Sequence, residues 1–231
     1  MNKVLISPRA DQKILNFFKN KGYEICHFKE MNHVYSSITD HLDTFMIKID
    51  DTYVIDPGFY KINKDLIDGL ALSYVLGDEN VSSTYPGTVR YNCLVGEDYL
   101  IHNLKYTDEK IKELSSSKKI INVKQGYCNC SICKVADDGF ITADKGISKA
   151  LRSNGFDVLL IEEGYISLRD QEYGFIGGAS STLKDGSILF LGDIRNHPSF
   201  DEIHEFLERK GVSYSFIQDF EMIDLGGFLT I

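Results

Sequence analysis

An internal repeat is the feature that most constrains how this chain can fold. Four short acidic turns each join two apolar, strand-like runs, and their landmarks are Asp51, Asp98, Asp138 and Asp185. The successive intervals are 47, 40 and 47 residues. Acidic and Asp-Gly turns between β-rich runs predict hairpins, and a period of about 40–50 residues indicates repeated supersecondary units.

Each predicted hairpin is followed by a helix-like segment and then by a further strand. Helix starts are predicted at Thr107 and at Ser199, where Glu202 would complete a capping box. Three helical patterns end at a glycine that directly precedes a strand-like run: Gly22, Gly155 and Gly211. Glycine suits the left-handed residue that ends many helices. The predicted unit is therefore strand, turn, strand, helix, strand.

The two ends of the chain supply a fifth unit. Residues 4–7 read as a strand that precedes a helix at about 10–21 and a strand at 23–28, but no hairpin partner comes before them. Residues 226–231 form a strand-like run with no helix after it. Pairing these two strands would close a ring and remove exposed sheet edges. An open α/β sheet or a TIM barrel is the alternative, although both predict one strand per helix.

Composition limits the classes of function. The 231 residues carry a net charge of −9, which disfavours non-specific binding to nucleic acid or to anionic membranes. No apolar run approaches the length of about 18 residues that a membrane-spanning helix needs. The N-terminus lacks a signal-peptide apolar core and the five cysteines are an odd number, so we expect a cytoplasmic protein without a disulfide framework.

Several segments resemble a known fold family. They are Gln125–Cys133, Ile141–Ile147, Tyr173–Ser180, Gly192-Asp193 with His197-Pro198, and Asp224–Gly227. Together with the five units, they resemble the pentein fold, the α/β propeller of the guanidine-modifying enzymes, and more narrowly an uncharacterised bacterial family of that fold. The resemblance implies a single pentein-like domain over residues 1–231, with five strand-strand-helix-strand units and termini that pair to complete the first.

The resemblance also implies a chemistry, from which this chain departs. Active penteins use a cysteine near the C-terminus, a histidine in a His-x-Asp pair, and carboxylates that hold the guanidinium group. Here the last strand, Asp224–Ile231, has no cysteine, and Thr230 falls near the nucleophile position. A His-x-Asp pair does occur at His41 and Asp43, but in an early unit. The cysteine hydrolase mechanism is therefore not transferred to this chain.

Superposing the repeats predicts which polar residues surround a central pocket. Before the first strands, Asp43, Asn92, Ser131 and Ser180 become equivalent, and His41, Arg90, Asn129 and Gly178 precede them by two. After the second strands, the equivalent set is Arg9, Asp56, Asn103, Asp144 and Asp193. The alignment of the repeats is uncertain by one residue, and a one-residue shift would move each side chain to the other face of its strand. His41 and Asp43 are read as an acid–base pair, a clamp or an exposed turn, and the aspartates also suit helix caps.

Three cysteines need a separate interpretation. Cys128, Cys130 and Cys133 could bind zinc or a cluster, but on an extended strand the first two face one side and the third faces the other. We therefore expect no metal and no cofactor, and we expect small core residues, with a displaced nucleophile as the alternative. The glycine-rich run 177–181 suits a close-packed strand start better than a phosphate loop.

Three functions stay open at this point. The favoured one is a protein that binds a small polar or cationic ligand in a central pocket. The alternatives are a hydrolase or transferase acting on a guanidino-type substrate, and a non-catalytic module that binds proteins through its rim. The partner expected from the sequence is a small molecule, and nothing in the sequence indicates an oligomeric state.

Overall fold

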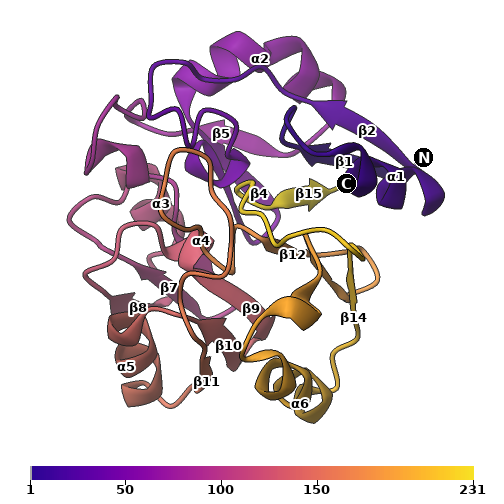
Figure 1. Ribbon diagram of the computed structural model, residues 1–231. Helices are drawn as coiled ribbons and strands as arrows, with labels where there is room; N and C mark the ends of the chain where they lie inside the picture. The colour runs from indigo at the N-terminus through magenta and orange to yellow at the C-terminus, as the bar shows by residue number, and fades with distance from the viewer. Residues whose placement is uncertain (1) are drawn as a thin grey trace.

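The computed structural model describes residues 2–231, and Met1 lies outside this range. These residues form five sheets of three strands each, arranged about a common centre (Figure 1). In each sheet an antiparallel pair of strands is joined through a helix to a third strand that runs parallel to the middle strand; the pair is a hairpin in four sheets and the two chain ends in the other. The five repeated units predicted from the sequence are therefore confirmed.

The elements of the units follow the chain. The first unit comprises β1 (Asn2–Ile6), α1 (Gln12–Asn20), β2 (Tyr23–His27) and β15 (Phe228–Thr230). The second comprises β3 (Met46–Ile49), β4 (Thr52–Ile55), α2 (Pro57–Gly69) and β5 (Tyr74–Leu76). The third comprises β6 (Leu94–Val95), β7 (Tyr99–His102), α3 (Glu109–Leu114) and β8 (Lys119–Asn122).

The fourth unit comprises β9 (Ile132–Ala136), β10 (Gly139–Thr142), α5 (Lys145–Ser153) and β11 (Asp157–Leu160), and the one-turn helix α4 (Cys128–Ser131) precedes it. The fifth comprises β12 (Ser180–Thr182), β13 (Ile188–Phe190), α6 (Phe200–Lys210) and β14 (Tyr214–Phe216). Three 3-10 turns lie in the connections: η1 (Leu42–Thr44), η2 (Gly87–Val89) and η3 (Ile194–Asn196).

The chain ends complete the first unit as the sequence predicted. Strand β15 pairs antiparallel with β1, with Val4 opposite Thr230 and Ile6 opposite Phe228. Backbone hydrogen bonds of 2.9 and 2.8 Å between Lys3 and Ile231 extend this pairing. The unpaired edges that both terminal strands would otherwise expose are thereby satisfied.

Capping explains where several helices begin. Asp56 accepts from the Phe59 amide at 2.6 Å, and Asp144 accepts from the Ile147 amide at 2.8 Å. One predicted cap is wrong, and the other stands at the predicted N-cap position but makes no side-chain cap bond. Asp108 rather than Thr107 caps α3, because the Thr107 hydroxyl bonds the His102 ring at 2.7 Å. Ser199 precedes α6 without a side-chain cap bond, since its hydroxyl accepts from the Glu162 amide at 3.1 Å.

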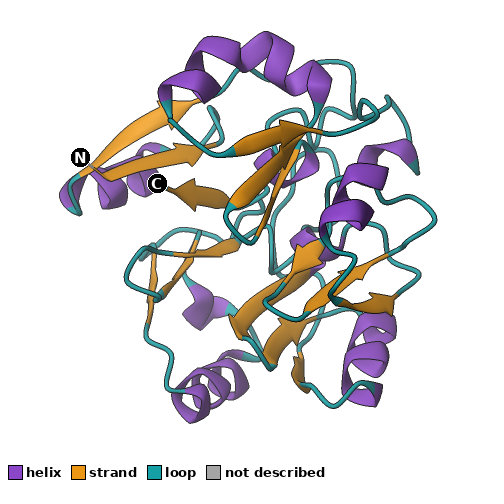
Figure 2. Ribbon diagram, turned by 180° about the vertical axis from the view of Figure 1, so that it is seen from behind, coloured by secondary structure: helices purple, strands orange, loops and turns teal. Residues whose placement is uncertain are grey.

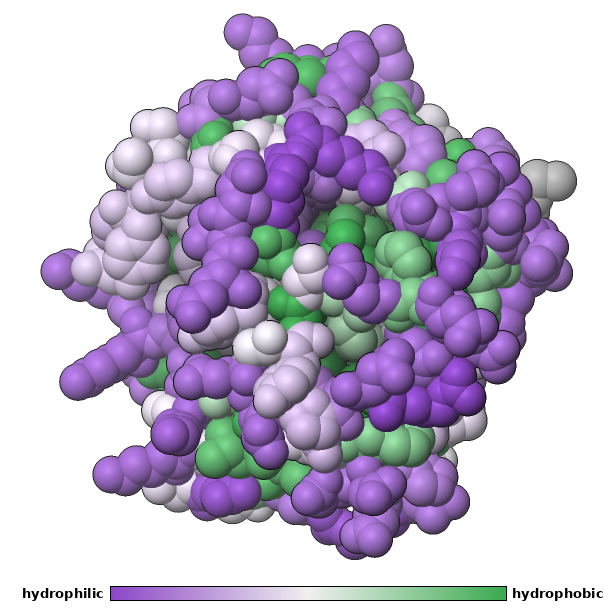
Figure 3. Space-filling model, viewed as in Figure 1, coloured by the Kyte–Doolittle hydropathy of each residue, from purple (hydrophilic) through white to green (hydrophobic). Residues whose placement is uncertain are grey.

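The core lies between each sheet and the helix that covers it. Figure 2 shows the longer helices at the periphery, with strands and short helical turns toward the centre. The apolar side of each helix supplies buried side chains such as Phe18, Phe59, Ile111, Leu151 and Leu207. On the face in Figure 3, hydrophobic residues gather near the middle and hydrophilic residues dominate the rim. Within residues 2–231, no helix has the length and apolar character needed to cross a bilayer.

Candidate functional site

A cavity of about 390 Å³ lies at the centre of the five units. Its floor is formed by three buried side chains, each placed shortly before the first strand of a unit: His41, Cys130 and Asp224. Its aromatic wall consists of Tyr35, Tyr85, Tyr127, Tyr173 and Phe175. The cavity volume falls within the range of about 300–1,000 Å³ that is typical of small-molecule sites.

The one-turn helix α4 places the Cys130 side chain in this floor. The Cys128 and Asn129 amides donate to the Asn92 carbonyl at 2.9 and 3.2 Å, and the Cys130 amide donates to Asn92 Oδ1 at 3.1 Å. Asn92 therefore holds the turn from the neighbouring unit. The expectation of an extended strand at 128–131 is wrong, because these bonds curl the segment. Cys128 instead donates to the Gln125 carbonyl at 3.2 Å, so the three nearby cysteines do not converge.

Two carboxylates and an amide surround the Cys130 thiol. Its Sγ donates to Asp43 Oδ2 at 2.8 Å and accepts from Asn92 Nδ2 at 3.2 Å. Burial, followed by the charges of Asp43 and Asp224, raises the pKa of Cys130 well above its usual value. Cys130 therefore rests as a neutral thiol, and a nearby positive charge would be needed to favour its thiolate.

Asp43 lies behind Cys130 rather than in the wall of the central cavity. It lines a smaller cavity of about 110 Å³, together with Asn129 and Gly226. Its Oδ2 accepts from Asn129 Nδ2 at 3.2 Å as well as from the thiol, while its Oδ1 is buried without a hydrogen-bond partner. One oxygen is thus held toward Cys130 and is placed to receive the thiol proton.

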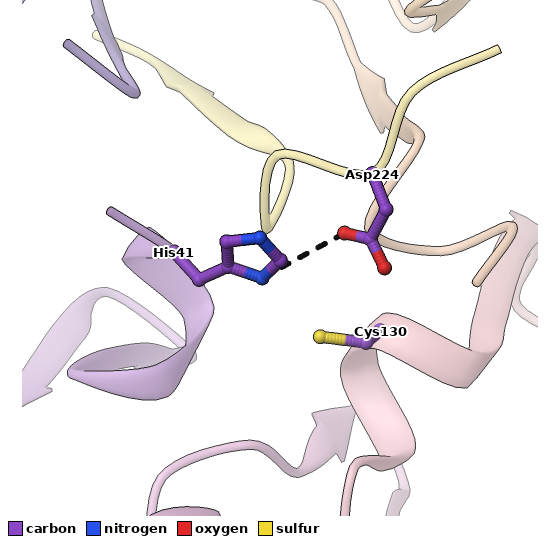
Figure 4. A group of neighbouring side chains, drawn as sticks. All are labelled: His41, Cys130 and Asp224. Carbon is purple, nitrogen blue, oxygen red and sulfur yellow. Dashed lines mark ion pairs between the residues drawn. The ribbon is translucent and has the colours of Figure 1, made fainter. Parts of the chain in front are cut away.

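His41 and Asp224 form the other half of the floor. Figure 4 shows their side chains and that of Cys130 directed toward one another from three separate segments. His41 Nδ1 lies 3.7 Å from Asp224 Oδ1 and is buried without a hydrogen-bond partner. The Phe175 and Gly226 amides donate to Asp224 at 2.9 and 3.0 Å. Burial raises the pKa of Asp224, and the facing His41 opposes that rise.

Two glycines make room for this arrangement. A Cβ on Gly178 would lie 1.9 Å from Asp224 Oδ1, and a Cβ on Gly226 would lie 2.6 Å from the His41 Cα. Gly226 also has a φ of +66°, a backbone conformation that residues other than glycine rarely adopt. The glycine-rich runs singled out in the sequence therefore serve close approach of the chain to the floor residues.

The structure brings three of the predicted site residues together: His41, Asp43 and Asn92. The other six lie away from the floor. Arg9 pairs with Glu30 at the surface, and Arg90 pairs with Glu79 at 2.5 Å. Asn103 donates to the Lys124 carbonyl at 2.9 Å. The aspartates cap the N-termini of α2, α5 and η3: Asp56, Asp144 and Asp193.

From the sequence, Cys130 was only one of three cysteines considered as a displaced nucleophile, and Asp224 was not singled out as a site residue. The predicted register took Ser131 as the fourth unit's equivalent of Asn92, which is one residue too far. Asp224 precedes β15, the strand that the superposition did not include. Thr230, the residue nearest the expected nucleophile position, lies within β15 opposite Val4.

The floor residues also offer the ligand types that zinc accepts. One atom each of His41, Cys130 and Asp224 lies within 4.8 Å of the other two. However, the thiol already donates to Asp43, and both Asp224 oxygens accept backbone amides. A metal ion bound through Cys130 would require the loss of the thiol proton and of its hydrogen bond to Asp43.

Comparisons with known proteins place the chain in a family. Residues 5–229 match the model of a family of unknown function, DUF6873, and the chain therefore belongs to that family. A search of curated proteins found no match.

Solved structures share its architecture. DDAH from Pseudomonas aeruginosa, a cysteine-to-serine mutant complexed with citrulline, superposes with a TM-score of 0.60 at 8% identity, over 93% of this chain and 91% of that one. Inosamine-phosphate amidinotransferase from Streptomyces griseus gives 0.59 at 11%, over 97% and 90%. Agmatine deiminase from C. jejuni gives 0.53 at 11%, over 92% and 74%. These similarities confirm the pentein fold.

Proposed function

We propose that this protein is a cysteine-dependent enzyme that hydrolyses or transfers the amidino group of small guanidino-type substrates. The observation that carries the proposal is the floor of the central cavity, where Cys130, His41 and Asp224 approach within 4.8 Å of one another. The names of the structural neighbours, which include amidinotransferases and a deiminase, support the same class of reaction.

The repeat explains how the nucleophile can stand in an unexpected place. Each unit presents the residues before its first strand to the same centre, so a given role can pass between units while the geometry is kept. Cys130 comes from the fourth unit, whereas Asp224 precedes the C-terminal strand in which the resemblance implies a cysteine. Catalytic constellations are recognised by geometry and role rather than by sequence position.

Substrate binding would activate the thiol. A guanidinium group in the cavity would donate hydrogen bonds to Asp224, whose oxygens keep free lone pairs beside their backbone donors. The bound cation would counter the carboxylates that hold Cys130 protonated. The thiol proton would then pass to Asp43 Oδ2, which is 2.8 Å away.

The chemical steps follow from these positions. Cys130 Sγ forms a bond to the guanidinium carbon, and a protonated His41 gives its proton to the departing amine as the C–N bond breaks. The amidino group is then held on sulfur as a thiouronium. Water or an acceptor amine attacks the same carbon and loses a proton to His41. The C–S bond breaks, and sulfur recovers its proton from Asp43.

The test is turnover of a panel of guanidino compounds, with acid quenching and intact-mass measurement to detect the thiouronium. We expect Cys130→Ser to abolish both product and adduct. Cys128→Ser, the same change in the same turn but outside the cavity, should retain both. Turnover by Cys130→Ser would refute the proposal. Binding of guanidino compounds to the wild type without any adduct or product would instead favour a non-catalytic ligand-binding protein.

A further inference from the structure

No lysine or arginine lines the central cavity among the residues that the structure describes. The ionisable groups of its floor are His41, Cys130 and Asp224. The other lining residues within 2–231 are tyrosines and residues with neutral side chains. Two lining residues are small or flexible neutral polar groups, Ser37 and Gln171. A ligand carboxylate inside would therefore lose water and face the Asp224 charge, and the one cationic group that it could meet, a protonated His41, already faces Asp224 at 3.7 Å.

The nearest arginine in the lining segments is already engaged. Arg169 lies between lining residues Leu168 and Gln171, and its guanidinium faces two carboxylates. Its Nη2 is 3.8 Å from Asp40 Oδ1, and its Nε is 3.7 Å from Asp170 Oδ2. Nη2 also donates to Thr39 Oγ1 at 3.3 Å. These contacts hold the guanidinium against groups that do not line the central cavity.

The aromatic wall offers a different kind of recognition. The Tyr35 hydroxyl accepts from the Tyr85 amide at 2.8 Å, and the Tyr127 hydroxyl bonds Thr88 Oγ1 at 2.7 Å. Because these hydroxyls are tied to protein groups, the rings are fixed and present apolar, electron-rich faces. Such faces pack against methylene chains and attract cations.

We infer that the substrates are carboxylate-free guanidines, in which an alkyl or aryl chain or a second amine replaces the amino-acid end. The inference rests on the proposed function, because it takes the floor as the guanidinium end of the site. The guanidinium lies against Asp224, and the rest of the molecule extends along the aromatic wall.

The test uses binding to the Cys130→Ser variant, measured by calorimetry, with agmatine, arginine and arginine methyl ester. Agmatine is arginine without its carboxylate, and the ester keeps the bulk while removing the charge. We expect agmatine and the ester to bind about tenfold to a hundredfold more tightly than arginine, which is the usual consequence of an unpaired buried polar group. Equal binding of all three, or preference for arginine, would overturn the inference while leaving the proposed function intact.

A gain-of-function variant makes the test independent of absolute affinity. Gln171→Arg would place a cation at the cavity wall and should narrow the difference between agmatine and arginine by about tenfold. Gln12→Arg adds the same charge on the exposed side of α1 and should leave the difference unchanged. If no guanidino compound binds to any variant and none is turned over by the wild type, both the inference and the proposed function are wrong.

Discussion

Replacing Asp43 by asparagine should make Cys130 chemically more reactive and the protein catalytically inactive. Asp43 Oδ2 lies 2.8 Å from Cys130 Sγ and opposes thiolate formation through its charge and its hydrogen bond. Asparagine has nearly the same shape and can still accept from Asn129 through its side-chain oxygen. The substitution therefore removes the charge while keeping most of the local packing.

The magnitude follows from Coulomb's law. Two unit charges 2.8 Å apart interact by about 6 kcal/mol at an effective dielectric constant of about 20, and by about 1.5 kcal/mol at that of water. The smaller value already corresponds to about one pKa unit. We therefore expect the pKa of Cys130 to fall by at least about one unit, and the alkylation rate below that pKa to rise about tenfold.

The assay is the rate of iodoacetamide alkylation at Cys130 across pH, followed by peptide mass spectrometry. Asp51→Asn, in the exposed β3–β4 turn of the same unit, is the control for a lost charge. Turnover of the best guanidino substrate should meanwhile fall, because Asp43 is the proposed acceptor of the thiol proton. An alkylation profile identical to that of the wild type would refute the assignment of Asp43 as the group that holds the thiol protonated.

Three further predictions concern the site and its frame. Gly178→Ala should lower the free energy of unfolding by about 1–3 kcal/mol, because the added Cβ would meet Asp224. Gly69→Ala, at the end of α2, should raise it by about 0.5–1 kcal/mol, because the added Cβ meets nothing within 4 Å. Urea unfolding of the two variants measures both changes. Thr230→Ala should leave turnover within about twofold of wild type, because Thr230 lies in β15 and the transition-state contacts come from the floor residues. A larger loss of turnover in steady-state kinetics would indicate that Thr230 acts as the nucleophile. Burial lowers the pKa of His102 to about 4 in the folded protein, below its value in the unfolded chain. The folded protein is therefore not destabilised by His102 above about pH 6.5, and it loses stability as the pH falls toward 4. That loss is about 2 kcal/mol at about pH 5, and NMR titration that showed His102 protonating near pH 6.5 in the folded protein would contradict it.

Much of the fold could be predicted from the sequence because hairpins and helix stops leave local signals. Gly22, Gly155 and Gly211 each have the positive φ that their positions before strands predicted. The pairing of β1 with β15 could also be predicted, since two strands without partners were left at the chain ends. Helix starts were less certain because the hydroxyls of Thr107 and Ser199 can bond groups outside their helices as readily as the helix amides.

The site was only partly predictable, because its geometry depends on contacts between units. His41 and Asp43 stood out as a local His-x-Asp pattern. Cys130 did not, because its direction is set by hydrogen bonds from Asn92, 38 residues earlier in the chain. A one-residue change in register then decided between Ser131 and Cys130, which periodicity alone does not resolve.

The most direct test of the account compares two electrophiles of nearly the same shape, 2-chloroacetamidine and 2-chloroacetamide. The first carries a planar cation like a guanidinium and the second is neutral. We expect the cationic reagent to alkylate Cys130 selectively and at least about tenfold faster, and we expect Asp224→Asn to remove most of this preference. Equal rates for the two reagents, or alkylation of a cysteine other than Cys130, would contradict a central cavity that uses Asp224 to direct cations onto the Cys130 thiol.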